Sequence, residues 1–225
     1  MTAIPANDTD QTNSRTLIRA LGIDPAQQPI ATRAALEALA SEVLNLREQR
    51  ADLIVELERA ETLADRDPLC PIFNRRAFER ELSREIALAA RYGTPLSLIF
   101  IDLDRFKLIN DRFGHTTGDR VIKHIAQTLS ENLRQTDIIG RLGGDEFGIA
   151  LTHAEHSDCL AKARQLESLI DALVVRDANE PSIAPVQLGA SCGTVEWSPG
   201  MNAASMIARA DETMFRNKSA RKAAR

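Results

Sequence analysis

Apolar residues recur at heptad spacing between residues 32 and 66, a stretch that contains neither glycine nor proline. With Leu36 at an a position, the a series is Leu36, Val43, Arg50, Leu57 and Ala64, and the d series is Leu39, Leu46, Leu53 and Ala60. Leucine at most d positions predicts the seam of a parallel dimeric coiled coil, with Glu42 at g facing Arg47 at e of the partner helix. Arg50 weakens this seam and is expected to fix its register. The alternative is a single amphipathic helix packed on its own domain, for which Ile54 and Leu63 lie beside the seam.

Residues 1–31 are predicted to be a flexible segment with one short helix. Residues 1–13 are polar and are expected to be disordered. Ser14 is placed to cap a helix that ends at Gly22. The pairs Asp24-Pro25 and Gln28-Pro29 then interrupt the chain before the heptad segment begins.

The pattern changes after Asp67, where Pro68 and Pro71 predict a turn. The hydrophobic periodicity that follows predicts helices at 75–91, 105–113, 117–133, 156–175 and 202–219, and strands at 96–103 and 186–195, with a hairpin between them. Because only one pair of strands is adjacent in sequence, we expect an α+β fold with a mixed or mainly antiparallel sheet.

Composition and charge narrow the possible functions. The chain has 225 residues, enough for one sizeable domain and an appendage, and its net charge of −4 argues against a general nucleic-acid-binding surface. No apolar run approaches the length of a membrane span, and the polar N-terminus lacks the apolar core of a signal peptide. Cys70, Cys159 and Cys192 are widely spaced, which predicts reduced thiols in a cytoplasmic protein.

The stretch R-L-G-G-D-E-F-G-I-A-L, residues 141–151, places two glycines directly before two carboxylates. Gly143 and Gly144 can adopt positive φ, which suits a tight turn between two strands. Asp145 and Glu146 offer the hard oxygen ligands that Mg²⁺ prefers, and glycines let the backbone approach a phosphate. The alternative is an ordinary hairpin with solvated acids.

A third carboxylate, Asp102, ends a strand dense in leucine, isoleucine and phenylalanine, where burial is costly unless the group binds something. Together with Asp145 and Glu146 it predicts a two-Mg²⁺ site for phosphoryl transfer. Lys107 is placed to neutralise a terminal phosphate. Asp104 and Asp111 are interpreted as solvated acids that flank a helix.

Four segments carry a family resemblance: I-D-L-D-R-F-K-L-I-N-D-R-F-G-H-T-T-G-D, R-L-G-G-D-E-F, S-C-G and A-R-A-D-E-T-M-F-R-N-K. In this order and spacing, the chain from about Asp67 to Lys218 resembles the GGDEF family of bacterial diguanylate cyclases. The resemblance implies a fold like the polymerase palm and the class III nucleotidyl cyclases. It also implies condensation of two GTP into cyclic di-GMP and two pyrophosphates by a dimer, with two Mg²⁺ (or Mn²⁺) ions per GTP site.

The resemblance also assigns roles to individual residues. The implied metal ligands are Asp102, the Leu103 carbonyl, Asp145 and Glu146, of which Asp145 and Glu146 are the catalytic pair. The implied substrate-binding residues are Asn110 and Asp119 for guanine, Lys107 and Lys218 for phosphates, backbone groups around Arg105, Phe106, Gly143 and Gly144, and His115 as a structural residue of the loop. A carboxylate suits guanine because it accepts from N1–H and N2–H, whereas adenine presents an acceptor at N1.

The segment R-Q-T-D matches the family's R-x-x-D inhibitory site, which implies product inhibition through Arg134 and Asp137. An arginine fork reads O6 and N7 of guanine; the alternative is a surface ion pair at the end of a helix. The family's D-x-L-T-G-L-x-N-R is changed here to D-P-L-C-P-I-F-N-R. Because Asp67 and Arg141 are both kept, we expect their structural coupling to survive.

The predicted organisation is therefore residues 1–31 as a flexible segment, 32–66 as a coiled-coil signalling helix and 67–225 as the catalytic domain. Expected partners are GTP, cyclic di-GMP, a second copy of the chain and a possible protein partner at the N-terminal segment. The rival hypotheses are a signalling adaptor that binds cyclic di-GMP without turnover and an ATP-using cyclase or palm. The complete G-G-D-E-F motif disfavours the adaptor, and Asn110 with Asp119 disfavours the use of ATP.

Overall fold

The protein is described by a computed structural model that covers residues 8–176 and 184–223. The chain forms two compact units, Met1–Ala64 and Asp65–Arg225. The predicted disorder of residues 1–13 is wrong for residues 8–13, which are helical, and its remainder, residues 1–7, lies outside the described residues.

The first unit begins with helix α1 (Asp8–Ala20), followed by a short 3-10 helix (Pro25–Gln27) and helix α2 (Ile30–Asp65). The predicted start of the first helix at Ser14 is wrong, because α1 begins at Asp8. Ser14 is instead buried within α1, where its hydroxyl lies 2.9 Å from the hydroxyl of Ser41 on α2. Asp24 caps the 3-10 helix by accepting from the Ala26 N–H, so the polar residues order this loop rather than simply interrupting a helix.

The heptad segment is helical as predicted up to Asp65, the last of the 36 residues of α2, whereas Arg66 forms a bridge with Phe73. Leu36 is half-buried, and the later seam residues Leu39, Val43, Leu46, Arg50 and Leu53 are exposed, with 64% exposure at Leu53. The side chains of Leu57 and Ala60 lie outside the described residues. The apolar seam of a single chain is therefore uncovered over this part of α2. Neither α2 nor any other helix in the described part of the chain is long and apolar enough to cross a membrane.

The second unit is built on a five-stranded sheet with strand order β1-β3-β4-β2-β7. The strands are β1 (Phe73–Asn74), β2 (Leu96–Asp104), β3 (Ile138–Arg141), β4 (Glu146–Thr152) and β7 (Gly189–Glu196). Only β1 and β3 pair in parallel; β3–β4, β4–β2 and β2–β7 are antiparallel. The prediction of an α+β fold with a mainly antiparallel sheet is confirmed.

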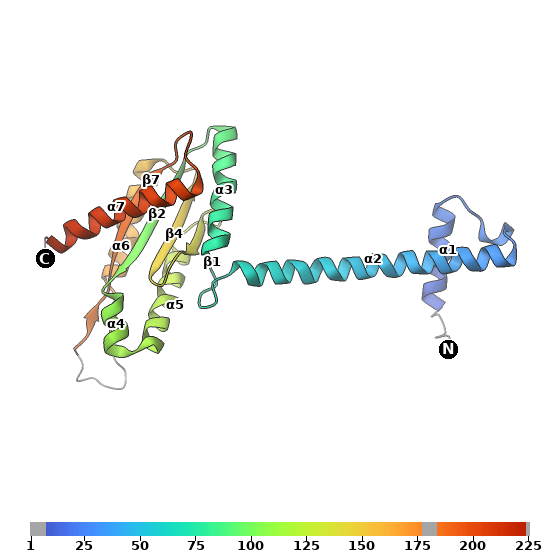
Figure 1. The fold of residues 1–225 in the computed structure, drawn as a ribbon, viewed down its shortest axis with the longest axis horizontal. Helices are drawn as coiled ribbons and strands as arrows, with labels where there is room; N and C mark the ends of the chain where they lie inside the picture. The colour runs from blue at the N-terminus through green and yellow to red at the C-terminus, as the bar shows by residue number, and fades with distance from the viewer. Residues whose placement is uncertain (1–7, 177–183, 224–225) are drawn as a thin grey trace. The chain divides into compact units, whose positions relative to one another are not determined.

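Helices cover both faces of this sheet (Figure 1). Helices α3 (Arg75–Tyr92) and α7 (Ala203–Ala223) pack on one face, and α5 (His115–Glu131) and α6 (His156–Asp171) on the other, with α4 (Phe106–Phe113) beside α5. Strand β2 is buried on both sides: Leu98 and Phe100 join the cluster under α3 and α7, while Ile99 and Ile101 join the cluster under α5 and α6. This explains the unbroken apolar run of its sequence.

Two predicted elements have different limits in the structure. The predicted helix 156–175 ends at Asp171, and Val174–Val175 forms the short strand β5. The predicted strand 186–195 is divided into β6 (Val186–Gln187), which pairs with β5, and the long strand β7. The Leu188 N–H donates to the Leu173 carbonyl between them, so this small ladder takes the ends of both predicted elements.

Helix α3 is fitted closely to the hairpin of β3 and β4. Its N-terminus is capped by Asn74, whose side chain accepts from the Ala77 N–H. One turn on, the fully buried Phe78 ring lies against two glycines of the hairpin. A Cβ atom would lie 2.7 Å from Phe78 at Gly140 and 2.8 Å from it at Gly148, so both positions require glycine. The hairpin and α3 therefore pack as one body.

Candidate active site

Asp102 and Glu146 lie directly opposite each other on the antiparallel strands β2 and β4, so their side chains share one face of the sheet. Asp145 precedes Glu146, and its carbonyl accepts from the Leu103 N–H at 3.1 Å. The pKa values of Asp145 and Glu146 are both raised, first by partial burial and then by the negative charge of Asp102. The three acids are thus close enough to sense one another, and a cation would relieve their repulsion.

The two glycines of the turn have a different function from the one predicted. Neither Gly143 nor Gly144 is among the positive-φ glycines of the structure, so the expectation of a left-handed turn is wrong. Gly143 is required for space, because a Cβ there would lie 2.3 Å from Oε2 of Glu146. A Cβ on Gly144 would meet no atom within 4 Å, so the turn is open on that side. The Leu142 N–H closes the turn by donating to the Glu146 carbonyl at 2.8 Å.

The Arg141 side chain hydrogen-bonds to the backbone of this turn. Its Nη2 donates to the Gly144 carbonyl at 2.7 Å, and its Nη1 lies 3.2 Å from Oδ1 of Asp67. Asp67 also accepts from the N–H groups of Leu69 and Cys70, which shapes the altered P-L-C-P turn. The expected Asp67–Arg141 contact is therefore present, while its part in coupling stays a prediction.

Lys218, on α7, hydrogen-bonds to Asp102, and its Nζ lies 3.9 Å from Oδ1 of Asp104. The interpretation of Asp104 as a solvated acid is wrong, because it is only 6% exposed and accepts from the Ser191 hydroxyl at 3.0 Å. It is buried because it belongs to β2 and lies beside β7, rather than at the start of the next helix. Asp111 is exposed, as expected.

Cationic side chains gather with Asp145 around a pocket of about 340 Å³. Its walls are Leu103, Asp104, Arg105, Phe106, Lys107, Asp145, Lys218 and Arg221. Arg105 has φ of 67°, a left-handed conformation that is uncommon outside glycine and that turns the chain sharply from β2 into α4. The pocket therefore brings together Lys107 and Lys218, the two lysines assigned to phosphates.

Arg221 is a residue of this pocket that sequence reasoning missed. It hydrogen-bonds to the Asp171 carboxylate and to the Ala190 carbonyl, and it lies 3.7 Å from Glu167. The signal in the sequence was its position three residues after Lys218, which places both side chains on one face of a continuing helix. Helix α7 continues past both residues to Ala223.

The predicted guanine pair comes from two successive helices, Asn110 from α4 and Asp119 from α5. The helices meet at Gly118, where a Cβ would lie 1.9 Å from Oδ1 of Asn110. This close approach places the Asn110 amide against the backbone of α5 at Gly118, the residue before Asp119, which is exposed. His115 is an exposed residue at the start of α5, where Gly114 with φ of 78° begins the helix.

Within the described residues, no three His, Cys, Asp or Glu side chains are grouped so that they could hold a metal ion. The predicted convergence of Asp102, Asp145 and Glu146 is therefore incomplete, and the Lys218 ammonium rests on Asp102. The donor chemistry still fits Mg²⁺, because all three acids offer hard oxygen atoms from two adjacent segments. The raised pKa values of Asp145 and Glu146 indicate negative charge that a cation would compensate.

Arg134 and Asp137 lie away from this site, at the turn between α5 and β3. The Asp137 carboxylate accepts from the Arg134 backbone N–H at 2.9 Å, and the Asp137 N–H donates to the Arg134 carbonyl. Asp137 therefore binds the backbone of Arg134 and not its guanidinium, so the two side chains do not form the surface ion pair of the alternative interpretation. Both residues line a second pocket, of about 330 Å³, together with Lys162 and Gln165 of α6.

Comparison with known sequences agrees with this geometry. The family described as "Diguanylate cyclase, GGDEF domain" matches residues 64–224. Diguanylate cyclase DosC of Escherichia coli K12 is 37% identical over 164 residues, which are 73% of this chain and 35% of DosC. Diguanylate cyclase DgcP of Pseudomonas aeruginosa is 34% identical over 185 residues, which are 82% of this chain and 27% of that protein. The chain thus spans about a third of the length of these curated relatives.

Solved structures show the same fold. The coiled coil and GGDEF domain of DgcB from Caulobacter crescentus, in complex with c-di-GMP, has a TM-score of 0.72 at 26% identity and covers 81% of this chain and 95% of its own. Diguanylate cyclase SiaD of Pseudomonas aeruginosa, in complex with its activator SiaC, has a TM-score of 0.63 at 25% identity and covers 91% and 94%. The chain therefore belongs to the family of diguanylate cyclase GGDEF domains.

Proposed function

We propose that this protein is a diguanylate cyclase that condenses two GTP into cyclic di-GMP and releases two pyrophosphates. The observation that carries the proposal is the arrangement at one edge of the sheet. Asp145 lines the pocket that holds Lys107 and Lys218, and Lys218 hydrogen-bonds to Asp102, which lies opposite Glu146. The Asn110–Asp119 pair follows on the next two helices. This set combines carboxylates for metal, cations for phosphate and acceptors for guanine, as a GTP site requires.

The reaction is attack of a 3′-hydroxyl on an α-phosphorus, with pyrophosphate leaving. We assign Asp102, the Leu103 carbonyl, Asp145 and Glu146 to Mg²⁺ or Mn²⁺, two ions per GTP; such ions lower the pKa of the attacking hydroxyl and neutralise phosphate charge. Lys107 and Lys218 bind the departing phosphates. Backbone N–H groups around Arg105, Phe106, Gly143 and Gly144 complete the phosphate cradle.

Base selection is assigned to Asn110 and Asp119. A carboxylate that accepts from N1–H and N2–H of guanine would face an acceptor at N1 of adenine, which leaves both groups unpaired. The close approach of Asn110 to Gly118 supports this assignment, because it brings the Asn110 amide to the turn of α5 that carries Asp119. His115 is assigned a structural role in the loop.

Each domain is proposed to bind one GTP, so turnover needs two domains that face each other. We assign residues 32–66 to a dimeric coiled coil and 67–225 to catalysis, and residues 1–31 to signal input. The uncovered apolar seam Leu39, Val43, Leu46 and Leu53 supports a second copy as the partner of α2. SiaD was solved with an activator protein, which supports a protein partner for the N-terminal segment here.

Two further properties are proposed. Cyclic di-GMP inhibits the enzyme by binding at Arg134 and Asp137, which already line a pocket of about 330 Å³. The protein acts in the cytoplasm, where its nucleotide substrate is found and where its three unpaired, buried cysteines remain reduced.

The test is to incubate the purified chain with GTP and Mg²⁺ and to resolve the products by chromatography. We expect cyclic di-GMP and pyrophosphate from GTP, no cyclic dinucleotide from ATP, and no product once the metal is chelated. One observation favours the rival adaptor, since the Lys218 ammonium rests on the proposed metal ligand Asp102. Tight binding of cyclic di-GMP with no turnover under any metal would establish that adaptor and reject the enzyme.

A further inference from the structure

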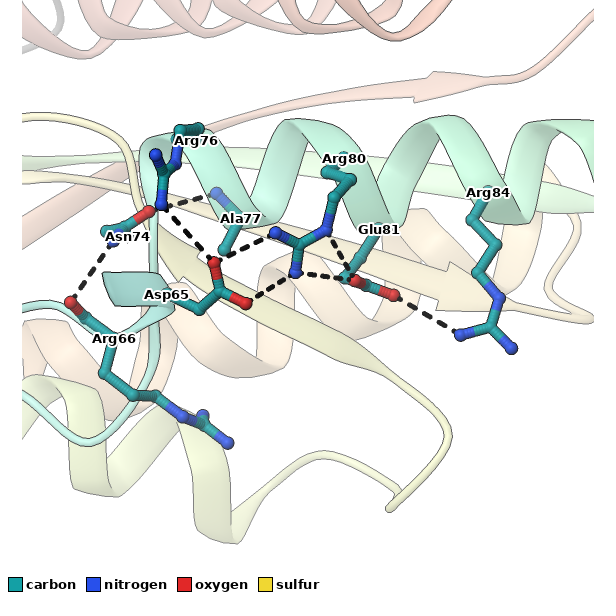
Figure 2. A network of polar contacts seen from close by, with 8 residues as sticks. All are labelled: Asp65, Arg66, Asn74, Arg76, Ala77, Arg80, Glu81 and Arg84. Carbon is teal, nitrogen blue, oxygen red and sulfur yellow. Dashed lines mark hydrogen bonds and ion pairs between the residues drawn. The ribbon is translucent and has the colours of Figure 1, made fainter. Parts of the chain in front are cut away.

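Asp65, the last residue of α2 and the first of the second unit, is held by α3. Its Oδ1 and Oδ2 accept from Nη1 and Nη2 of Arg80 at 2.9 and 2.7 Å, and the guanidinium of Arg76 lies 3.8 Å away (Figure 2). The Asp65 side chain is only 16% exposed, and the hydrogen bond from Arg80 lowers its pKa. This fork-to-fork pairing fixes direction as well as distance.

The same helix holds the active-site turn. Phe78, two residues before Arg80, fills the space over Gly140 and Gly148 of the β3–β4 hairpin. Arg75, one turn earlier, donates to the Leu142 carbonyl at 3.4 Å, directly before the two glycines. Helix α3 therefore touches the hairpin on both sides of the turn that carries Asp145 and Glu146.

We propose that Asp65 and Arg80 are positioning residues for catalysis, which act through α3 on the turn of Gly143 to Glu146. The proposal rests on the cyclase activity proposed above. A displacement of Asp65 is carried by Arg80 to α3, and then by Phe78 and Arg75 to the hairpin. The end of α2 is thus linked through α3 to the position of the Asp145 and Glu146 carboxylates.

This route is separate from the Asp67–Arg141 contact. Asp67 reaches the turn through Arg141 and the Gly144 carbonyl, without α3. Asp65 reaches it through side chains of α3 alone. The contacts of Asp65 and Asp67 are therefore independent. Together they link the position of the Gly143–Glu146 turn to the end of α2.

Because Arg80 is about half exposed, its ion pair adds little to the stability of the fold. Loss of the pair should instead appear in turnover, since a small misplacement of catalytic groups is costly. Asp65→Asn keeps the shape of the side chain and removes its charge, and Arg80→Gln removes the other partner. Arg84→Gln is the matched control, because Arg84 is on the same helix and pairs with Glu81 but not with Asp65.

The experiment measures kcat and KM for GTP, thermal unfolding and sedimentation for the full-length wild type, these three variants and the Asp65→Asn/Arg80→Gln double variant. We expect Asp65→Asn and Arg80→Gln each to lower kcat by about threefold to tenfold, with KM changed by less than about twofold. The double variant should lose no more than either single variant, because both remove one contact. Arg84→Gln should match the wild type.

Three results would overturn the inference. The first is a kcat for Asp65→Asn and Arg80→Gln equal to that of Arg84→Gln, and the second is additive losses in the double variant. The third is a loss of activity that only follows a loss of folded protein or of dimer. If the wild-type chain itself makes no cyclic di-GMP, the proposed function fails, and this inference fails with it.

Discussion

A Cβ atom on Gly143 would lie 2.3 Å from Oε2 of Glu146, so the glycine provides the space in which the carboxylate lies. The nearest atom is the end of a flexible side chain, which can move without disturbing the fold. Gly140 differs, because a Cβ there would lie 2.7 Å from Cβ of Phe78, a fully buried residue of the core.

Gly143→Ala is therefore expected to displace the Glu146 carboxylate and lower kcat by at least about tenfold, with a nearly unchanged melting temperature. Gly140→Ala should instead lower the free energy of unfolding by about 1–3 kcal/mol through overpacking. Paired measurements of kcat and thermal unfolding test both. A destabilised but fully active Gly143→Ala variant would contradict the contact with Glu146.

Glu146→Gln and Asp145→Asn should abolish cyclic di-GMP synthesis and yet stabilise the metal-free fold at neutral pH. The folded-state pKa of each acid is raised, so the ionised form destabilises the fold above that pKa. In the wild type, stability should rise as the pH falls from the raised pKa to the ordinary carboxyl value. Thermal unfolding in a chelator across pH, alongside turnover at saturating Mg²⁺, measures both effects. A fully active, folded Glu146→Gln variant would reject the metal assignment.

Asp119→Asn should weaken the preference for GTP over ATP. The amide presents a donor as well as an acceptor, so it no longer repels N1 of adenine. Asp119 is exposed on α5, and the substitution should therefore leave the melting temperature within about 2 °C. Competition between the two nucleotides for turnover gives the ratio, and an unchanged ratio would remove Asp119 as the reader.

Arg134→Ala should relieve inhibition by added cyclic di-GMP and leave the initial rate similar to that of the wild type. The Asp137 carboxylate accepts from the backbone N–H of Arg134, so this hydrogen bond of the turn survives the loss of the Arg134 side chain. Asp137→Ala is harder to interpret, because it also removes the hydrogen bond that orders the turn. Initial rates over a range of added product decide the question; equal inhibition of wild type and Arg134→Ala would place the inhibitory site elsewhere.

The seam of α2 predicts a further outcome. Glutamate at both Leu46 and Leu53 should dissociate the dimer and remove activity together, because charge opposes charge across the seam. Val55→Glu is the control, since Val55 is 44% exposed but lies on the opposite side of the heptad. Sedimentation and GTP turnover across protein concentration report both properties. A dimeric, active double variant would show that α2 does not assemble the enzyme.

Much of the fold could be predicted from the sequence because its signals are local. The apolar run at β2 and the long glycine-free heptad gave correct elements, with ends shifted by a few residues. The burial of Asp104 could not be foreseen, because it depends on β7 pairing with β2 from a distant part of the chain. The spacing of Arg221 from Lys218 was visible in the sequence, but its ion pair with Asp171 was not, because that pair depends on how α7 lies against α6.

The function of Gly143 shows a second limit. Residue type suggested left-handed backbone, whereas the structure uses the absence of a side chain. Both explanations require glycine, so the sequence alone could not separate them. The surroundings of Asp145 and Glu146 were predicted only from the family resemblance. The contact of Lys218 with Asp102 could not be predicted, because it depends on how α7 packs across the sheet.

The leucine stripe of α2 has a consequence for the cell. If two chains join along it, the amount of active enzyme rises with roughly the square of the chain concentration while most copies are single. The rate of expression would then act as an input in its own right, apart from any ligand or partner. A modest rise in copy number would switch on synthesis steeply, and dilution by growth would switch it off.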